Sequence, residues 1–89
     1  MKLQDMPEGT LFAVLTYRIS RHTAWEINLY RKTETPYRAG TQHGGDHLGS
    51  DYADTLWGAK HAAWKLYRRY LKRRKLGDGH TITMVMGKD

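Results

Sequence analysis

Residues 51–76 carry the pattern that most constrains how this chain can fold. Apolar and aromatic side chains recur there at helical spacing, and at 100° per residue they share one broad face. These residues are Tyr52, Ala53, Leu56, Ala59, Ala63, Leu66, Tyr67, Tyr70 and Leu71. Ser50 or Asp51 is a suitable N-cap, and Gly77 is a suitable residue just beyond the C-terminus. The sequence therefore predicts one long amphipathic helix over about residues 51–76, whose apolar face packs on another layer.

Two segments before this helix alternate with the period of a β-strand. After a turn at residues 7–10, every odd position from Leu11 to Ile19 is apolar or aromatic. A short connection at residues 20–22 leads to a second run, in which Trp25, Ile27 and Leu29 alternate with polar residues. This pattern predicts an antiparallel hairpin with the odd positions facing the core.

The remaining elements are a third strand and a final strand. Tyr37–His43 is a weaker strand candidate, and residues 44–49 are expected to form a polar, flexible loop. Ile82, Met84 and Met86 alternate as a last strand after the turn at residues 78–79. The predicted fold class is α+β: an antiparallel sheet in the order β-β-β-α-β, packed on one long amphipathic helix as a two-layer sandwich. Residues 1–89 are expected to form a single domain.

The composition excludes several kinds of protein. The 89 residues include no cysteine, which rules out disulfides, thiolate metal sites and cysteine nucleophiles. No apolar run approaches the roughly 18 residues needed to span a bilayer, and residues 1–6 lack the apolar core of a signal peptide. We therefore expect a cytoplasmic protein that is not associated with a membrane.

Positive charge is concentrated in one segment. Residues 55–77 contain eight Lys and Arg residues and no Asp or Glu, whereas the rest of the chain is slightly acidic. The formal net charge of +6 therefore comes from the predicted helix. Such a segment is typical of a surface that binds a polyanion or an acidic partner, although helix C-termini also favour cations.

The edge of the predicted helix is the first candidate site. Trp57, His61 and Trp64 are followed on one stripe by Arg68, Lys72 and Lys75. In a nucleic-acid site the cations would neutralise phosphates and the aromatic rings would stack on bases. The alternative is a structural role, in which the two tryptophans form the rim of the core and the lysine side chains cover them. The residues predicted to contact the phosphate backbone of a nucleic acid are Lys60, Lys65, Arg68, Arg69, Lys72, Arg73, Arg74 and Lys75. Trp64 or Tyr30 is predicted to stack on its bases.

The outward face of the sheet is the second candidate. It is expected to present Phe12, Val14, Arg18, Tyr30, Lys32 and Arg38. Such a mixture of apolar, aromatic and basic groups suits single-stranded nucleic acid, a protein partner or a second copy of the chain. An open sheet edge could also support a homodimer.

Metal binding and catalysis have little support. His43, Asp46 and His47 bring two imidazoles and a carboxylate into five residues, but their spacing matches no established metal-binding pattern, and a polar loop is the simpler interpretation. No paired nucleophile and base and no Walker-type phosphate loop is present. We expect no metal site, no cofactor and no enzymatic activity.

The run Ala59-Lys60-His61-Ala62-Ala63, followed by Tyr67 and Leu71, is similar to the last helix of double-stranded-RNA-binding domains. In that family three antiparallel strands also precede the helix, and lysines at its N-terminus contact RNA phosphates. The resemblance implies such a role for Lys60. This sequence departs from the family because it lacks a helix before the strands and adds a strand after the helix. The plan of three strands and a helix also resembles the arm-binding domains of phage integrases, which use the sheet to bind DNA.

In size and one-domain organisation the chain resembles accessory proteins of bacteriophages and mobile elements. The resemblance implies a location in the host cytoplasm and a nucleic acid or a host protein as partner. Two functions follow. The first is binding of DNA or RNA with low sequence specificity, through phosphate contacts from the cationic helix. The second is docking of the basic helix or the open sheet face on an acidic host protein.

Overall fold

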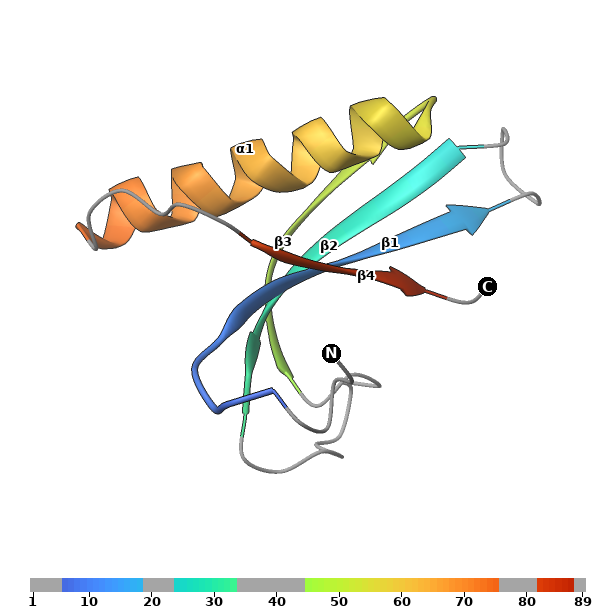
Figure 1. Ribbon diagram of the computed structural model, residues 1–89. Helices are drawn as coiled ribbons and strands as arrows, with labels where there is room; N and C mark the ends of the chain where they lie inside the picture. The colour runs from blue at the N-terminus through green and yellow to red at the C-terminus, as the bar shows by residue number, and fades with distance from the viewer. Residues whose placement is uncertain (1–5, 19–23, 34–44, 76–81, 88–89) are drawn as a thin grey trace.

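A computed structural model of the chain describes residues 6–18, 24–33, 45–75 and 82–87. Its elements are β1 (Leu11–Arg18), β2 (Ala24–Lys32), β3 (Gly45–Ala53), α1 (Leu56–Arg74) and β4 (Thr83–Gly87). The strands form one sheet in the order β3-β2-β1-β4, and α1 packs across one face of it (Figure 1). The predicted α+β class, with the element order β-β-β-α-β and one helix on a sheet, is confirmed.

The sheet is mixed rather than purely antiparallel. β1 pairs with β2 in the antiparallel sense, which confirms the predicted hairpin, and β2 pairs with β3 in the same sense. β4 instead runs parallel to β1, with Ala13 opposite Met84 and Leu15 opposite Met86. Parallel pairing is possible because β2, β3 and α1 intervene between the two strands, which gives the chain length to return to the same end of the sheet.

The third strand lies later in the sequence than expected. Residues 45–53 pair with β2, so the prediction of a loop at residues 45–49 is wrong, while the candidate strand Tyr37–His43 lies outside the described residues. Gly45 is buried, and a Cβ there would come within 3.3 Å of the Phe12 ring. The absence of a side chain at this position therefore permits close packing within the sheet and does not mark a flexible loop.

The helix is shorter than predicted at both ends. The predicted N-caps Ser50 and Asp51 belong to β3, and the observed N-cap is Thr55, whose hydroxyl accepts a hydrogen bond from the Gly58 amide at 2.9 Å. Sheet pairing up to Ala53 keeps the preceding backbone extended, so the helix begins only after the chain leaves the sheet. Lys75, with φ of 54°, ends it in a left-handed conformation, ahead of the predicted Gly77.

One face of α1 forms the main core with the sheet. The buried helix residues are Ala59, Ala62, Ala63, Leu66, Tyr67 and Leu71. They pack on Ala13, Leu15, Ile27 and Leu29 of the two central strands. The alanines let the helix backbone approach the sheet closely, and Ala59 and Ala63 are completely inaccessible to solvent. Tyr52 and Leu56, which were expected on this face, are exposed, the former because it belongs to β3.

β1 is covered on both faces, by the core under α1 on one face and by a second apolar cluster on the other. Phe12 and Val14 point away from the helix and form a second cluster with Met6, Tyr30 and Val85. Phe12, Ala13 and Leu15 are all completely buried. An apolar run without alternation, Leu11–Leu15, is typical of a strand covered on both sides.

The core predicts a clear contrast between buried and exposed truncations. Ile27→Ala should lower the free energy of unfolding by about 2–5 kcal/mol, because it leaves a cavity between β2 and α1. Met86→Ala, at a position that is 56% exposed, should cost about 0.5 kcal/mol or less. Urea unfolding of both variants, monitored by circular dichroism, measures the difference. Similar losses in the two variants would show that the β2 register is wrong.

Candidate functional site

The eight cations of residues 55–77 all lie on the exposed surface of α1 and its C-cap. All of them are exposed: Lys60, Lys65, Arg68, Arg69, Lys72, Arg73, Arg74 and Lys75. This surface, called here the cationic surface, is wider than the predicted stripe because the alanine-lined face occupies only the side toward the sheet. Three of the cations lie in the last helical turn, where they also complement the helix dipole.

Within the part of the chain that the structure describes, no carboxylate neutralises the cationic surface. The ion pairs found there, Arg18 with Glu26 and Arg31 with Asp46, both lie on the sheet. Two arginines of the helix instead lie over aromatic rings, Arg68 at 6.0 Å from the centre of Trp64 and Arg74 at 5.5 Å from that of Tyr70. The positive potential of the helix is therefore available to an external anion.

The cations of the helix also repel one another. Lys65 and Arg69, Arg68 and Lys72, and Arg69 and Arg73 are each four residues apart, so their side chains are neighbours on the helix surface. Like-charge pairs at this spacing each destabilise a helix by about 0.2–0.5 kcal/mol. An anionic ligand lying along the helix would relieve this repulsion.

The two tryptophans of the predicted stripe have different environments. Trp57 is 78% exposed, and its ring stacks on that of His61, with 5.7 Å between centres and 8° between planes. Trp64 is half-buried, packs against the core and contacts Tyr67. The alternative that made both tryptophans the rim of the core therefore holds for Trp64 alone. The sequence places both rings on one stripe but cannot distinguish their burial.

Tyr30, the other predicted stacking residue, is not part of this surface. It lies on the sheet face opposite α1, half-buried, with its ring stacked on Phe12 at 5.5 Å and near His47 at 5.4 Å. Burial, together with the negative charge of Glu26, raises the pKa of the Tyr30 hydroxyl. A ring packed in the second cluster is not free to stack on a base beside the helix.

The sheet face opposite α1 is less open than expected. Phe12, Val14 and Lys32, which were predicted to point into solvent, are buried. The Lys32 ammonium donates to the Thr33 carbonyl oxygen at 2.9 Å. Arg38 lies outside the described residues. Among the residues that the structure describes, this face therefore lacks the exposed mixture of apolar and basic groups that suggested a nucleic-acid or protein surface.

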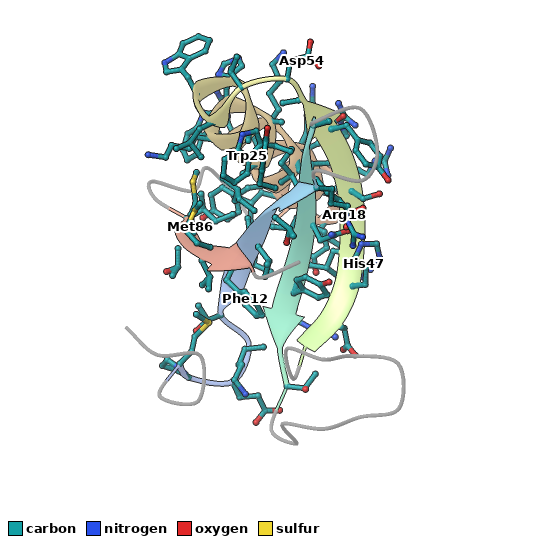
Figure 2. The ribbon with its side chains drawn as sticks, turned by 90° about the vertical axis from the view of Figure 1, so that its right-hand side faces the viewer. Phe12, Arg18, Trp25, His47, Asp54 and Met86 are labelled. Carbon is teal, nitrogen blue, oxygen red and sulfur yellow. The ribbon has the colours of Figure 1, made fainter. Side chains whose placement is uncertain are left out.

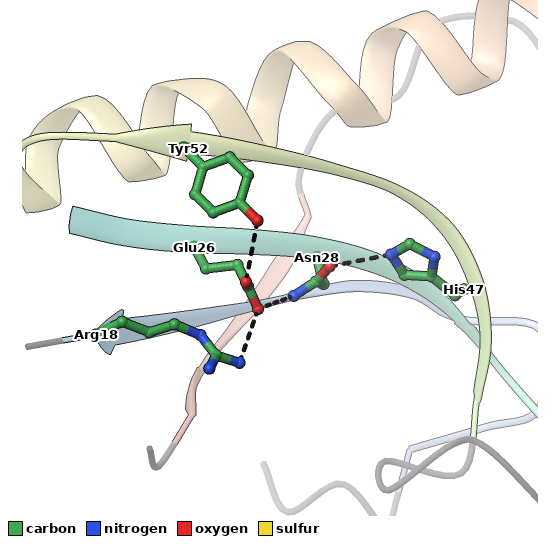
Figure 3. A network of polar contacts seen from close by, with 5 residues as sticks. All are labelled: Arg18, Glu26, Asn28, His47 and Tyr52. Carbon is green, nitrogen blue, oxygen red and sulfur yellow. Dashed lines mark hydrogen bonds and ion pairs between the residues drawn. The ribbon is translucent and has the colours of Figure 1, made fainter. Parts of the chain in front are cut away.

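Polar side chains from three strands form a network on the same face (Figure 3). Glu26 accepts hydrogen bonds from Arg18 at 3.1 Å, from Asn28 at 3.0 Å and from the Tyr52 hydroxyl at 3.3 Å. The Asn28 carbonyl oxygen lies 3.0 Å from His47 Nε2, which must be the donor. These five residues come from β1, β2 and β3, so only the strand register brings them together.

Ionisation of Glu26 is favoured by this network. Burial disfavours the charged carboxylate, but the hydrogen bond from Asn28 and the charge of Arg18 outweigh it, with further hydrogen bonds from Arg18 and Tyr52. The pKa of Glu26 is therefore lowered from its ordinary value. At neutral pH the network contains a charged carboxylate, and its geometry suits a structural tie between strands.

This lowered pKa predicts how stability depends on pH. A carboxyl whose pKa is lower in the folded state stabilises the fold above its unfolded pKa of about 4.3, and this contribution is lost as pH falls through the folded pKa. Glu26→Gln should therefore be less stable than the wild type near pH 7, and the difference should shrink toward pH 3. Urea unfolding at several pH values measures it. A difference that does not change with pH would contradict the role assigned to Glu26.

Asp46 and His47, two of the three residues predicted as possible metal ligands, do not share a face of the sheet. Asp46 and His47 are adjacent in β3, so their side chains point to opposite faces of the sheet, where they contact Arg31 and Asn28 respectively. His43 lies outside the described residues. Among the residues that are described, no group of three or more potential ligands could hold a metal ion.

Exposed apolar side chains gather at β4, beyond the part of the sheet that α1 covers. Met84 and Met86 share the face of Ala13 and Leu15, and Met86 is 56% exposed. Tyr17, on the same face of β1, is also exposed and contacts Trp25. Figure 2 shows Met86 on β4 and His47 on β3, at opposite edges of the sheet.

Comparison of the chain with protein-family models, curated proteins and solved structures finds no match. The described residues also include no helix with the length and apolar character needed to cross a membrane.

Proposed function

We propose that the protein binds nucleic acid through the cationic surface of α1. The observation that carries this proposal is the exposure of all eight cations, with no carboxylate among the described residues to neutralise them. Lysine and arginine side chains at a surface neutralise phosphates and release bound counterions, which is the main source of sequence-independent affinity. The protein does no chemistry on its ligand in this proposal.

Low sequence specificity follows from the kind of contact. Most of the cations are long, flexible side chains on a convex helix, which suits phosphate oxygens better than base edges. Direct readout requires side chains held at fixed positions against base edges. We therefore expect both DNA and RNA to bind, with similar affinity for unrelated sequences of equal length.

Charge reversal on the helix tests the proposal. In Lys65→Glu/Lys72→Glu both changed residues are exposed and without an ion partner among the described residues, so the fold should persist. Binding of a fluorescent oligonucleotide at 50 mM salt should weaken by about tenfold or more. The slope of log affinity against log salt should fall in magnitude by about 2, since each lost phosphate contact removes about one.

A matched control separates local contacts from net charge. Lys2→Glu/Lys88→Glu changes the net charge by the same amount but alters residues outside the helix. It should retain most of the affinity and nearly all of the salt slope. Equal losses in the two double variants would mean that overall charge, and not the cationic surface, attracts the ligand. Absence of binding by the wild type at 50 mM salt would refute the proposed function.

A second candidate, a protein-interaction module, is favoured by the apolar side chains at β4. Met84, Met86 and Tyr17 are exposed together, and the strand that bears the methionines has no charged residue between Thr83 and Gly87. A second copy of the chain is the partner to test first, because an edge strand can pair with its own counterpart.

Sedimentation analysis of the wild type and of Met86→Lys distinguishes a dimer from a monomer. A concentration-dependent dimer that is lost in the variant supports this function, and a monomer at all concentrations excludes self-association.

A further inference from the structure

The exposed side of α1 has aromatic rings and one cation, Lys60, in its first half and most of its cations in its second half. Trp57 and His61 lie in its first two turns, whereas six of the eight cations follow Lys65. Trp57 and Lys72 lie on neighbouring parts of this face and are separated by about 22 Å along the helix axis, at 1.5 Å per residue. A ligand that lies along the helix therefore meets rings at one end and charges at the other.

Packing in the core does not explain why a large aromatic side chain stands at position 57. It belongs to neither hydrophobic cluster, and its ring contact among the described residues is with His61, which is itself exposed. His61 lies against one face of the indole, and the 78% exposure of Trp57 leaves the rest of the ring available to a flat partner. Large aromatic rings that project into solvent beside cations are typical of surfaces on which bases stack.

We propose that the ligand is a single-stranded nucleic acid, with an unpaired base stacked on Trp57 and the adjoining phosphates on the cations of the second half of α1. This inference rests on the proposed function and narrows it to a class of ligand. A duplex offers its phosphates to the same cations, but its base faces are stacked on one another and cannot reach the indole without disrupting the pair. A single strand exposes both groups at once, so it uses both halves of the helix face.

The arrangement also assigns separate effects to the two halves. Stacking on an indole does not depend on counterion release, so removing Trp57 should alter affinity without altering the salt slope. Removal of cations should alter both. Trp64 lies between the two halves of the helix. It packs against the core and Arg68 lies over its ring, so its faces are not open to a base.

The experiment compares the 89-residue wild-type chain with Trp57→Ala and Trp57→Phe. Fluorescence anisotropy is measured with labelled oligo(dT), oligo(rU) and a DNA duplex, each of about 12 nucleotides per strand. Trp57→Ala should weaken binding of the single strands by between about fivefold and a hundredfold, leaving the duplex affinity and the salt slope unchanged. Trp57→Phe should restore most of the loss. The dT and rU arms show whether DNA and RNA both fit.

Tryptophan fluorescence gives an independent signal of stacking. A base on the indole should quench the emission of the wild type on binding, and the quenching should largely disappear in Trp57→Phe, although Trp25 and Trp64 remain. Because Trp57 is 78% exposed, both variants should melt at the temperature of the wild type.

The outcomes separate this inference from the proposed function. Single-strand binding that survives Trp57→Ala unchanged would overturn the inference while leaving phosphate binding by the cationic surface intact. Equal losses for duplex and single strand in that variant would also overturn it. Loss of all binding at 50 mM salt in the wild type would remove both. Displacement of oligonucleotides by equal charge concentrations of polyglutamate would overturn both in favour of an acidic protein partner.

Discussion

Burial of one side of α1 against the sheet is the constraint on which the rest of the structure depends. Ala59 and Ala63 bring the helix close to β1 and β2, so the larger residues Leu66, Tyr67 and Leu71 fill the space beside them. With that side fixed, every charged residue of the helix must point into solvent or along its flanks. The exposure of the cations is a consequence of packing on the opposite side.

This arrangement lowers the stability of the helix, because its own cationic side chains repel one another. Charges spaced four residues apart recur along its second half, and no carboxylate from the described residues lies among them. The sheet face opposite α1 differs, because there the charges of Arg18 and Glu26 are paired within a network. The contrast between a compensated sheet and an uncompensated helix is the strongest physical reason to place ligand binding on α1.

Much of the fold could be predicted from the sequence, for reasons that are local. The alternation of Trp25, Ile27 and Leu29 and the helical spacing from Ala59 to Leu71 each indicate one element and its buried side. The third strand could not be predicted in the same way. Its glycines and polar residues, Gly45–Ser50, have the composition of a loop, and they are strand only because β2 offers them a pairing edge.

Part of the candidate site could also be predicted, because it depends on local properties of the sequence. Its cations follow from composition, since a segment without acids remains basic in any fold. The burial of Phe12 and the partial burial of Tyr30 were not predictable from alternation alone, because a second apolar cluster forms on the face that the alternation assigned to solvent. The same cluster removed Tyr30 from the predicted stacking residues.

The sequence by itself determined that a long basic helix would pack on a hairpin, because hydrophobic periodicity and charge are properties of neighbouring residues. Only the tertiary structure decided that β4 lies parallel to β1, that β3 comprises residues 45–53, and that Trp57 is exposed while Trp64 is half-buried. These features depend on contacts between residues far apart in the chain. Local patterns do not encode such contacts, since strand pairing and burial are settled by which surfaces meet when the layers pack.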